Sequence, residues 1–168
     1  MAAQHLANRL HAFDVAITSS GLMAMDGHPI DSGSRETYET LTSTALTEHK
    51  AQQFLVSQAL DADLVLTATR DHRTQIIQAA PSTMAKTFTL REFARLVHTI
   101  NAANFGGSIS EAIAMVAAQR GQQQAPVELA EDDIIDPYLR EELIYKVATM
   151  QIIESTDAIA SFIAATLT

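Results

Sequence analysis

The 168-residue sequence contains no cysteine and no tryptophan, and only 5% of its residues are aromatic. Without cysteine, these residues cannot form disulfides, thiolate metal sites or a cysteine nucleophile. Aliphatic side chains must therefore fill the core, and a hydrophobic content of 47% is enough for a sizeable one. Acidic residues outnumber basic ones by 20 to 11, and the net charge of −9 argues against binding to nucleic acid.

Membrane and export signals are also missing from the sequence. No apolar run approaches the roughly 20 residues that a bilayer-spanning helix needs. The N-terminal stretch MAAQHLANRLHAF has its apolar residues interrupted by Gln4, His5, Asn8 and Arg9, so it lacks the pattern of a signal peptide. We expect a cytoplasmic protein without a membrane partner, folded as a single domain over residues 1–168.

Apolar and amphipathic segments alternate along the chain. Strands are predicted at 13–19 (FDVAITS), 63–69 (DLVLTAT) and 86–90 (KTFTL). Helices are predicted at 2–12, 34–44, 51–59, 70–79, 91–100, 111–120 with Ser110 as N-cap, and 139–167 with an inward stripe of Ile144, Ala148, Ile152, Ile159 and Ile163. Gly106–Gly107 and GQQQAP predict breaks. Such alternation predicts an α/β fold of three layers, with a small parallel sheet flanked by helices.

The stretch DDIIDPYLR, residues 132–140, contains the main candidate for chemistry. Asp136 precedes Pro137 and Tyr138, just before the last predicted helix. Asp-Pro is a common turn opener, and an acidic run such as 131–133 is ordinarily solvated, so the residues alone favour a simple turn. The functional alternative is a general acid.

Other polar residues show no pattern typical of a site. The six histidines have no metal-ligand spacing and are interpreted as surface or packing residues. Ser19 and Ser20 lack a surrounding G-x-S-x-G, and Gly106-Gly107-Ser108 lacks the lysine of a P-loop. The residues therefore predict no metal site.

Taken in order, several segments resemble the low-molecular-weight protein-tyrosine phosphatase family, whose relatives include arsenate reductases. These segments are MAAQHLANRL, DVAITSSGL, GHPID, ADLVLTATRDHR, KTFTLREFARL and DPY before the final helix, and they cover nearly the whole chain. The resemblance implies a four-stranded parallel sheet and hydrolysis of phosphotyrosine through a cysteinyl-phosphate, with no cofactor. By position, Asp136 corresponds to the general acid of the family, and Tyr138 would border the substrate entrance. The implied substrate is a phosphotyrosine protein or a small phosphoester.

The chain departs from the family pattern at its start. The phosphate loop of the family, C-x5-R-S/T, lies between the first strand and the first helix, whereas this sequence begins M-A-A-Q where that helix would open. The first strand, the nucleophilic cysteine and the phosphate-binding arginine are thus expected to be missing from residues 1–168. We expect no family-type hydrolysis by these residues alone.

Three interpretations follow from this departure. Met1 is an internal methionine of a longer, working phosphatase; or the chain is a non-catalytic binding or regulatory relative; or it is an α/β protein with an unrelated ligand. The missing strand would be central, between Asp14–Ser19 and Asp63–Thr69. Either these segments close up and pair, or a second chain supplies a strand in a homodimer, or the sheet is loosened.

Overall fold

The computed structural model describes residues 1–100, 108–120, 122 and 129–168. The α-helices are α1 (Ala2–Arg9), α2 (Ser32–Thr42), α3 (Val56–Asp61), α4 (Arg70–Ala79), α5 (Leu90–Val97), α6 (Ile109–Ala118) and α7 (Glu142–Leu167). Two 3-10 helices, η1 (Pro81–Lys86) and η3 (Leu129–Asp132), and two strands, β1 (Val65–Thr67) and β2 (Thr87–Thr89), complete the described elements. None of the helices within these ranges is both long enough and apolar enough to cross a bilayer.

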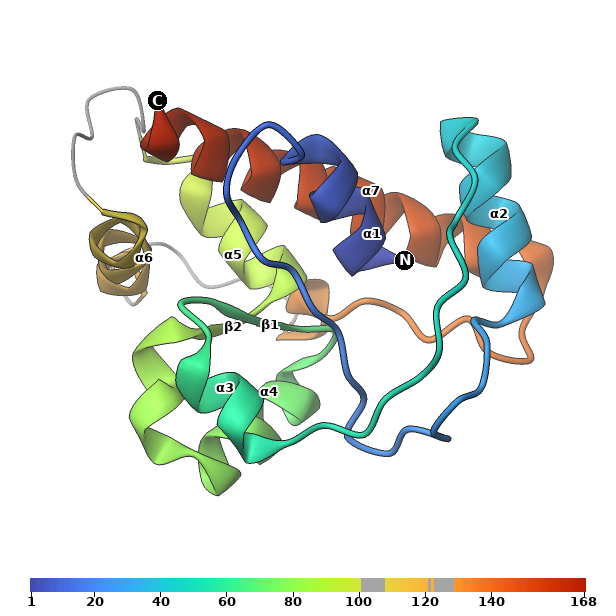
Figure 1. Cartoon of the computed structure of the whole chain (residues 1–168), viewed down its shortest axis with the longest axis horizontal. Helices are drawn as coiled ribbons and strands as arrows, with labels where there is room; N and C mark the ends of the chain where they lie inside the picture. The colour runs from blue at the N-terminus through green and yellow to red at the C-terminus, as the bar shows by residue number, and fades with distance from the viewer. Residues whose placement is uncertain (101–107, 121, 123–128) are drawn as a thin grey trace.

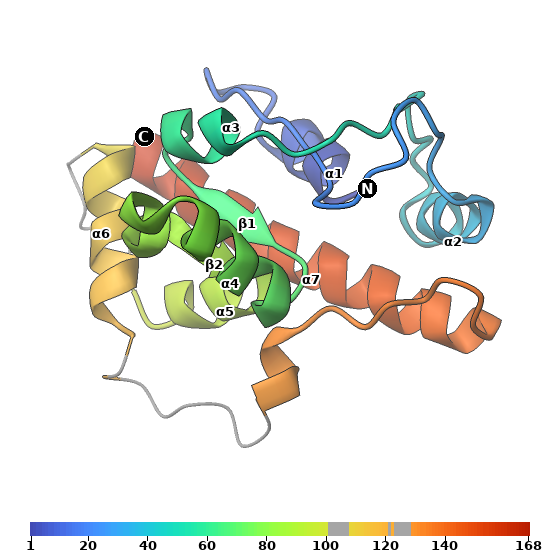
Figure 2. The same cartoon turned by 90° about the horizontal axis from the view of Figure 1, so that it is seen from below.

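A small parallel sheet lies between two layers of helices. β1 and β2 pair in register from Val65 with Thr87 to Thr67 with Thr89. Figure 1 shows α1, α5 and α7 on one side of the strands and α3 and α4 on the other, and Figure 2 shows the same layers from below. The predicted fold class, a three-layer α/β arrangement around a small parallel sheet, is confirmed.

The core lies between the sheet and the layer formed by α5 and α7. Phe88 on β2 meets Phe93 on α5 edge-to-face, with ring centroids 4.9 Å apart, and Phe93 meets Phe162 on α7 at 6.0 Å. Edge-to-face rings at this separation are favourable beyond their buried area. The predicted inward stripe of the last helix is confirmed, with Ala148, Ile159 and Ile163 buried and Ile144 and Ile152 half-buried.

The first predicted strand does not form. Phe13, Val15 and Ile17 are half-buried, and the intervening residues are exposed, which is the period-two alternation of a strand. Within the described residues, however, Ala16–Ser20 make no backbone hydrogen bond. This segment also does not pair with β1, so the two segments do not close up. The prediction was wrong because a strand also needs a neighbour, and periodicity cannot supply one.

Only the helix at 70–79 has both of its predicted bounds, and the other helices differ at one or both ends. The helix predicted from residue 51 begins at Val56. Helix α6 is capped by Ser108 rather than Ser110, because Ser108 and Glu111 form a reciprocal capping box. Helix α7 begins at Glu142 rather than at Leu139, since Leu139 has a left-handed φ of 57°. The breaks predicted at Gly106–Gly107 and GQQQAP lie outside the described residues, Gln122 excepted.

Candidate functional site

The loop that carries Asp136 joins η3 to α7 and is docked on the carboxyl ends of both strands. The backbone N–H of Ile134 donates to the carbonyl of Ala68, just after β1, at 2.9 Å. The hydroxyl of Thr89, the last residue of β2, donates to the carbonyl of Asp132 at 2.6 Å. Ligands of open parallel sheets bind outside the carboxyl ends of the strands. The loop therefore lies at the edge where this class of fold places its site.

Two carboxylates of the acidic run anchor this loop. Asp132 is buried, and Arg95 Nη2 lies 3.0 Å from its Oδ2 and 3.2 Å from its Oδ1. Asp133 accepts from the backbone N–H of Arg70, at the start of α4, at 2.7 Å. Arg91 Nη1 donates to the carbonyl of Asp133 at 3.1 Å. The expectation of a solvated acidic run was wrong for Asp132 and Asp133, because arginines and a helix N-terminus meet them.

Asp136 itself lies at the exposed tip of this anchored loop. Its Oδ1 accepts the backbone N–H of Tyr138 at 3.0 Å, which is the geometry of an Asx-type turn. Its Oδ2 has no hydrogen-bond partner in the part of the chain that the structure describes. The side chain of Tyr138 is 59% exposed. A free carboxylate oxygen and an open aromatic ring are thus presented to solvent from a loop whose base is fixed.

A groove of about 650 Å³ opens between the segment 14–18 and strand β1. Leu6 of α1 and Ile163 of α7 line it on one side, and Ala59 of α3 and Ile76 of α4 line it on the other. It extends to Thr67 and Ala68, the carboxyl end of β1 where the Asp136 loop is docked. We name this cavity the β1 groove.

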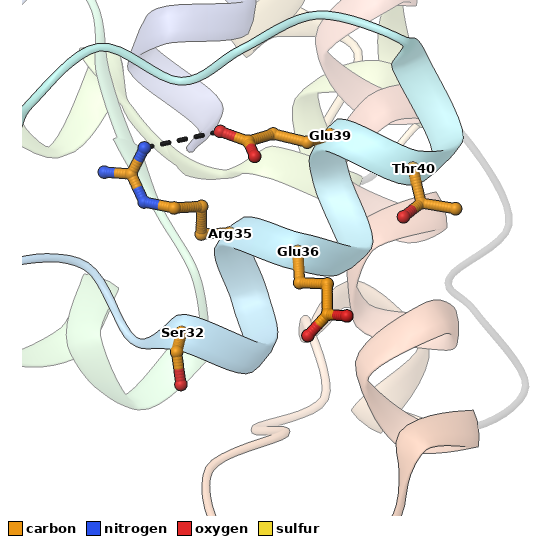
Figure 3. Close-up of a pocket in the computed structure, with 5 residues that line it drawn as sticks. All are labelled: Ser32, Arg35, Glu36, Glu39 and Thr40. Atoms are coloured by element: carbon orange, nitrogen blue, oxygen red, sulfur yellow. Dashed lines mark hydrogen bonds and ion pairs between the residues drawn. The ribbon is translucent and has the colours of Figure 1, made fainter.

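A second hollow lies on the surface of α2 (Figure 3). Its lining side chains, all from this one helix, are Ser32, Arg35, Glu36, Glu39 and Thr40. The guanidinium of Arg35 is already engaged by Glu39 Oε1 at 3.3 Å and by the carbonyl of Leu46 at 2.7 Å. No convergent polar groups from other elements complete it, so it is not a candidate site.

A buried ion cluster that the sequence interpretation missed lies beside the sheet. Glu92 on α5 accepts from Arg73 Nη1 at 2.6 Å and from Arg120 Nε at 2.9 Å. The Arg120 guanidinium also stacks 3.7 Å above the ring of Phe88. The sequence contains one signal for this ion cluster, the T-x-x-E pattern of Thr89 and Glu92. These two residues form a capping box at the start of α5.

The environment of Glu92 shifts its acidity. Burial by itself would raise the pKa of this carboxyl. The hydrogen bond and positive charge of Arg120, followed by those of Arg73, lower the pKa by more than burial raises it. The pKa of Glu92 therefore lies below its usual value. The cluster therefore keeps Glu92 ionised and joins α4, α5 and the end of α6.

His5 confirms the packing interpretation for one of the histidines. It is buried on α1, where its Nδ1 lies 2.9 Å from the Tyr38 hydroxyl and its Nε2 lies 3.0 Å from Asp157 Oδ1. Arg9 also contacts Asp157 at 3.0 Å. Tyr38 is only 1% exposed, so its hydroxyl is not available as a nucleophile. Across the described ranges, no group of three or more His, Cys, Asp or Glu side chains gathers to hold a metal ion.

Comparison with known proteins identifies the fold. No family model matches the sequence, and no curated protein matches it. Solved structures do match. YwlE arginine phosphatase from Geobacillus stearothermophilus superposes with a TM-score of 0.69 at 20% identity, covering 97% of this chain and 82% of that one.

Two further structures agree. The low-molecular-weight protein tyrosine phosphatase from T. tengcongensis has a TM-score of 0.66 at 20% identity, over 95% of this chain and 87% of that one. Vibrio vulnificus Wzb, solved in complex with benzylphosphonate, has a TM-score of 0.65 at 19% identity, over 95% and 86%. The helices on both faces of the parallel sheet belong to one known architecture. The chain has the fold of the low-molecular-weight protein tyrosine phosphatases.

Proposed function

We propose that this domain acts in the hydrolysis of phosphate monoesters, with Asp136 as general acid and Tyr138 bordering the substrate entrance. The observation that carries the proposal is the anchored loop. Ile134 and Asp132 fix its base to the carboxyl ends of β1 and β2 in a phosphatase fold, while Asp136 keeps one oxygen free. A proton donor needs this combination of a fixed position and an unoccupied oxygen.

The chemistry that Asp136 would perform is protonation of the leaving group. Cleavage of an aryl phosphate leaves negative charge on the aryl oxygen, and a positioned carboxylic acid neutralises it as the bond breaks. General acid catalysis of this kind contributes about 10²–10⁴-fold to the rate. The ring of Tyr138, two residues away and open to solvent, would contact an aromatic leaving group in this proposal.

The nucleophile and the phosphate cradle are not found among residues 1–168, because the sequence holds no cysteine. These residues alone are therefore proposed to be inactive towards aryl phosphates by the cysteinyl-phosphate route. In this proposal the working enzyme includes the missing groups. The alternative is a non-catalytic binding or regulatory domain, which the absence of every cysteine from residues 1–168 favours.

The substrate is proposed to be a phosphorylated protein side chain or a small phosphoester. The solved structures of this fold include some described as tyrosine phosphatases and others described as arginine phosphatases, so the fold does not determine which phosphorylated side chain is the substrate. A cytoplasmic location is also part of this proposal.

The test compares the protein purified from its natural host with residues 1–168 prepared alone. The substrates are p-nitrophenyl phosphate and phenyl phosphate. In the host-made protein, that is, the protein expressed in and purified from its natural host, Asp136→Asn should lower kcat by about 10²–10⁴-fold for phenyl phosphate. The loss should be smaller for p-nitrophenyl phosphate, because its weakly basic leaving group needs less protonation. Asp71→Asn, an exposed carboxylate on α4, serves as the control and should leave kcat unchanged.

Residues 1–168 prepared alone should show no turnover above the Asp136→Asn variant. Turnover that survives Asp136→Asn in the host-made protein would remove Asp136 from the mechanism. An inactive host-made protein would overturn the catalytic proposal and leave the binding domain.

A further inference from the structure

We propose that the outer side of the first half of α7 is a contact surface for a second copy of this chain, with the two α7 helices antiparallel across a twofold axis. This surface, which we name the α7 stripe, consists of Leu143, Val147 and Met150. The proposal goes beyond phosphoester chemistry and depends neither on Asp136 nor on the β1 groove.

The α7 stripe is an exposed apolar surface along one side of a helix. Leu143 is 65% exposed, Val147 is 36% exposed and Met150 is 49% exposed. Because residues three and four positions apart lie on the same side of a helix, these three side chains form one continuous strip. The core-facing side of α7 is a different one, on which Ala148 and Ile159 are buried. The packing of the chain itself therefore does not account for the stripe.

The loop before α7 widens this apolar surface. The backbone N–H of Ile135 donates to Gln151 Oε1 at 3.0 Å, which holds this part of the loop against α7, one residue from Met150. Ile135 is 38% exposed and Leu139 is 81% exposed. Leu139 also has a left-handed φ of 57°, a conformation that is strained for a leucine. Contiguous exposed apolar surface of this kind is typical of an interaction site.

The charges at the two ends of the stripe select a second copy as the occupant. Arg140 precedes the stripe, and Glu154 follows it, one turn after Met150 on the same side of the helix. Both are exposed, and across the described ranges neither side chain has a hydrogen bond or an ion pair. An antiparallel contact brings Arg140 of each copy to Glu154 of the other, whereas a parallel contact would bring like charges together. The surface is thus complementary to itself, as a twofold dimer requires.

The antiparallel contact also pairs the apolar side chains. With the axis between Val147 and Met150, each of these residues lies opposite the other one in the second copy. Leu143 then lies over the aliphatic part of Glu154. The steps from Leu143 to Val147, Met150 and Glu154 are four, three and four positions, which is the spacing of contact positions in helices that pack along each other.

The size of the surface determines how strong the contact is. Leu143 and Met150 lie seven positions apart on α7, which is about 10 Å of helix at 1.5 Å per residue. An area of this size lies at the low end of specific interfaces. We therefore expect a reversible dimer with a dissociation constant of roughly 10–1000 μM. At the low micromolar concentrations of a denaturation experiment, the chain stays monomeric.

The test is sedimentation equilibrium of the full chain at loading concentrations from about 10 μM to 1 mM. We expect a monomer–dimer equilibrium. Leu143→Glu should weaken it at least about tenfold, because it places two carboxylates in the apolar contact. The substitution leaves α7 intact, because an acidic residue is favourable in the first turn of a helix.

Leu60→Glu is the matched control for this substitution. Leu60 is 49% exposed on α3, which lies on the other side of the sheet from α7 (Figures 1 and 2). The control adds the same charge to the chain away from the stripe, so it should leave the dissociation constant unchanged.

Charge reversal tests the antiparallel pairing. Arg140→Glu and Glu154→Arg should each weaken the dimer by about three- to tenfold at low salt, because each brings like charges together at both ends of the twofold contact. The chain with both substitutions should recover most of the affinity, since opposite charges meet again.

Four results would overturn the proposal: a monomer throughout the concentration range, no weakening by Leu143→Glu, equal weakening by Leu60→Glu, or no recovery in the doubly substituted chain. The last result would exclude the antiparallel contact even if a dimer forms. None of them bears on the Asp136 assay.

Discussion

The Glu92 cluster provides the sharpest prediction about stability. Glu92 is 6% exposed and is held by two arginines, whereas Arg73 and Arg120 keep side-chain exposures of 25% and 27%. Glu92→Gln preserves the shape of the side chain and can still accept the backbone N–H of Thr89, to which the carboxylate now lies at 3.2 Å. The substitution therefore removes the negative charge and little else.

The expected cost follows from leaving two guanidinium groups without their counter-ion. Removing one partner of a fully buried ion pair costs about 3–5 kcal/mol. Water reaches a quarter of each arginine side chain and offsets part of this, so we expect a loss of about 2–3 kcal/mol. For a chain of this size, that corresponds to a fall in Tm of about 4–12 °C.

The assay is urea denaturation at neutral pH, with Glu154→Gln on the exposed face of α7 as the matched control. The control should change the free energy of unfolding by less than about 0.5 kcal/mol. Because the pKa of folded Glu92 lies below its unfolded value, its stabilisation is present above the unfolded pKa. This stabilisation is lost as the pH falls through the folded pKa. The free energies of unfolding of the unsubstituted protein and of Glu92→Gln should therefore converge in acid. A Glu92→Gln loss no larger than that of the control would refute the reasoning.

Three further predictions concern side-chain contacts of the helices and of the Asp136 loop. Arg95→Met should speed amide exchange at Ile134, because the loop base loses its buried ion pair; unchanged exchange would show that the pair does not anchor the loop. Burial raises the pKa of Tyr38, so its stabilisation is present below about pH 10 and is lost as the pH rises through the folded pKa. Tyr38→Phe should reduce that alkaline loss in a pH series of urea melts, and an unchanged loss would exclude Tyr38 as a source. Gly33→Ala should lower the stability, because its new Cβ would lie 2.8 Å from the ring of Tyr145; in a Tyr145→Ala background the same substitution should be neutral or stabilising, and a loss in both backgrounds would contradict the clash.

Local signals in the sequence predicted the helices well. The helix at 70–79 has the predicted bounds, because Thr69 caps its start and Pro81 follows its end. The T-x-x-E pattern at Thr89 likewise coincides with a real capping box at the start of α5. These devices act over three or four residues, so a single sequence contains them in full.

Long-range contacts are what the sequence could not predict. Asp132 was expected in solvent, but its partner Arg95 lies 37 positions earlier in the chain. The segment Phe13–Ser19 has the alternation of a strand, yet a strand also needs an adjacent backbone that periodicity does not reveal. The turn at Asp136 was the local part of its prediction and is present as an Asx-type turn.

The measurement that most directly tests the account is an NMR search for contacts between the backbone protons of residues 15–18 and those of residues 64–67 in the free protein. Paired strands lie about 4.7–4.9 Å apart, close enough for strong cross-strand contacts. The open β1 groove predicts none, together with rapid amide exchange at Ala16–Ser20. Cross-strand contacts between the two segments would show that the sheet closes on itself and that the β1 groove does not exist.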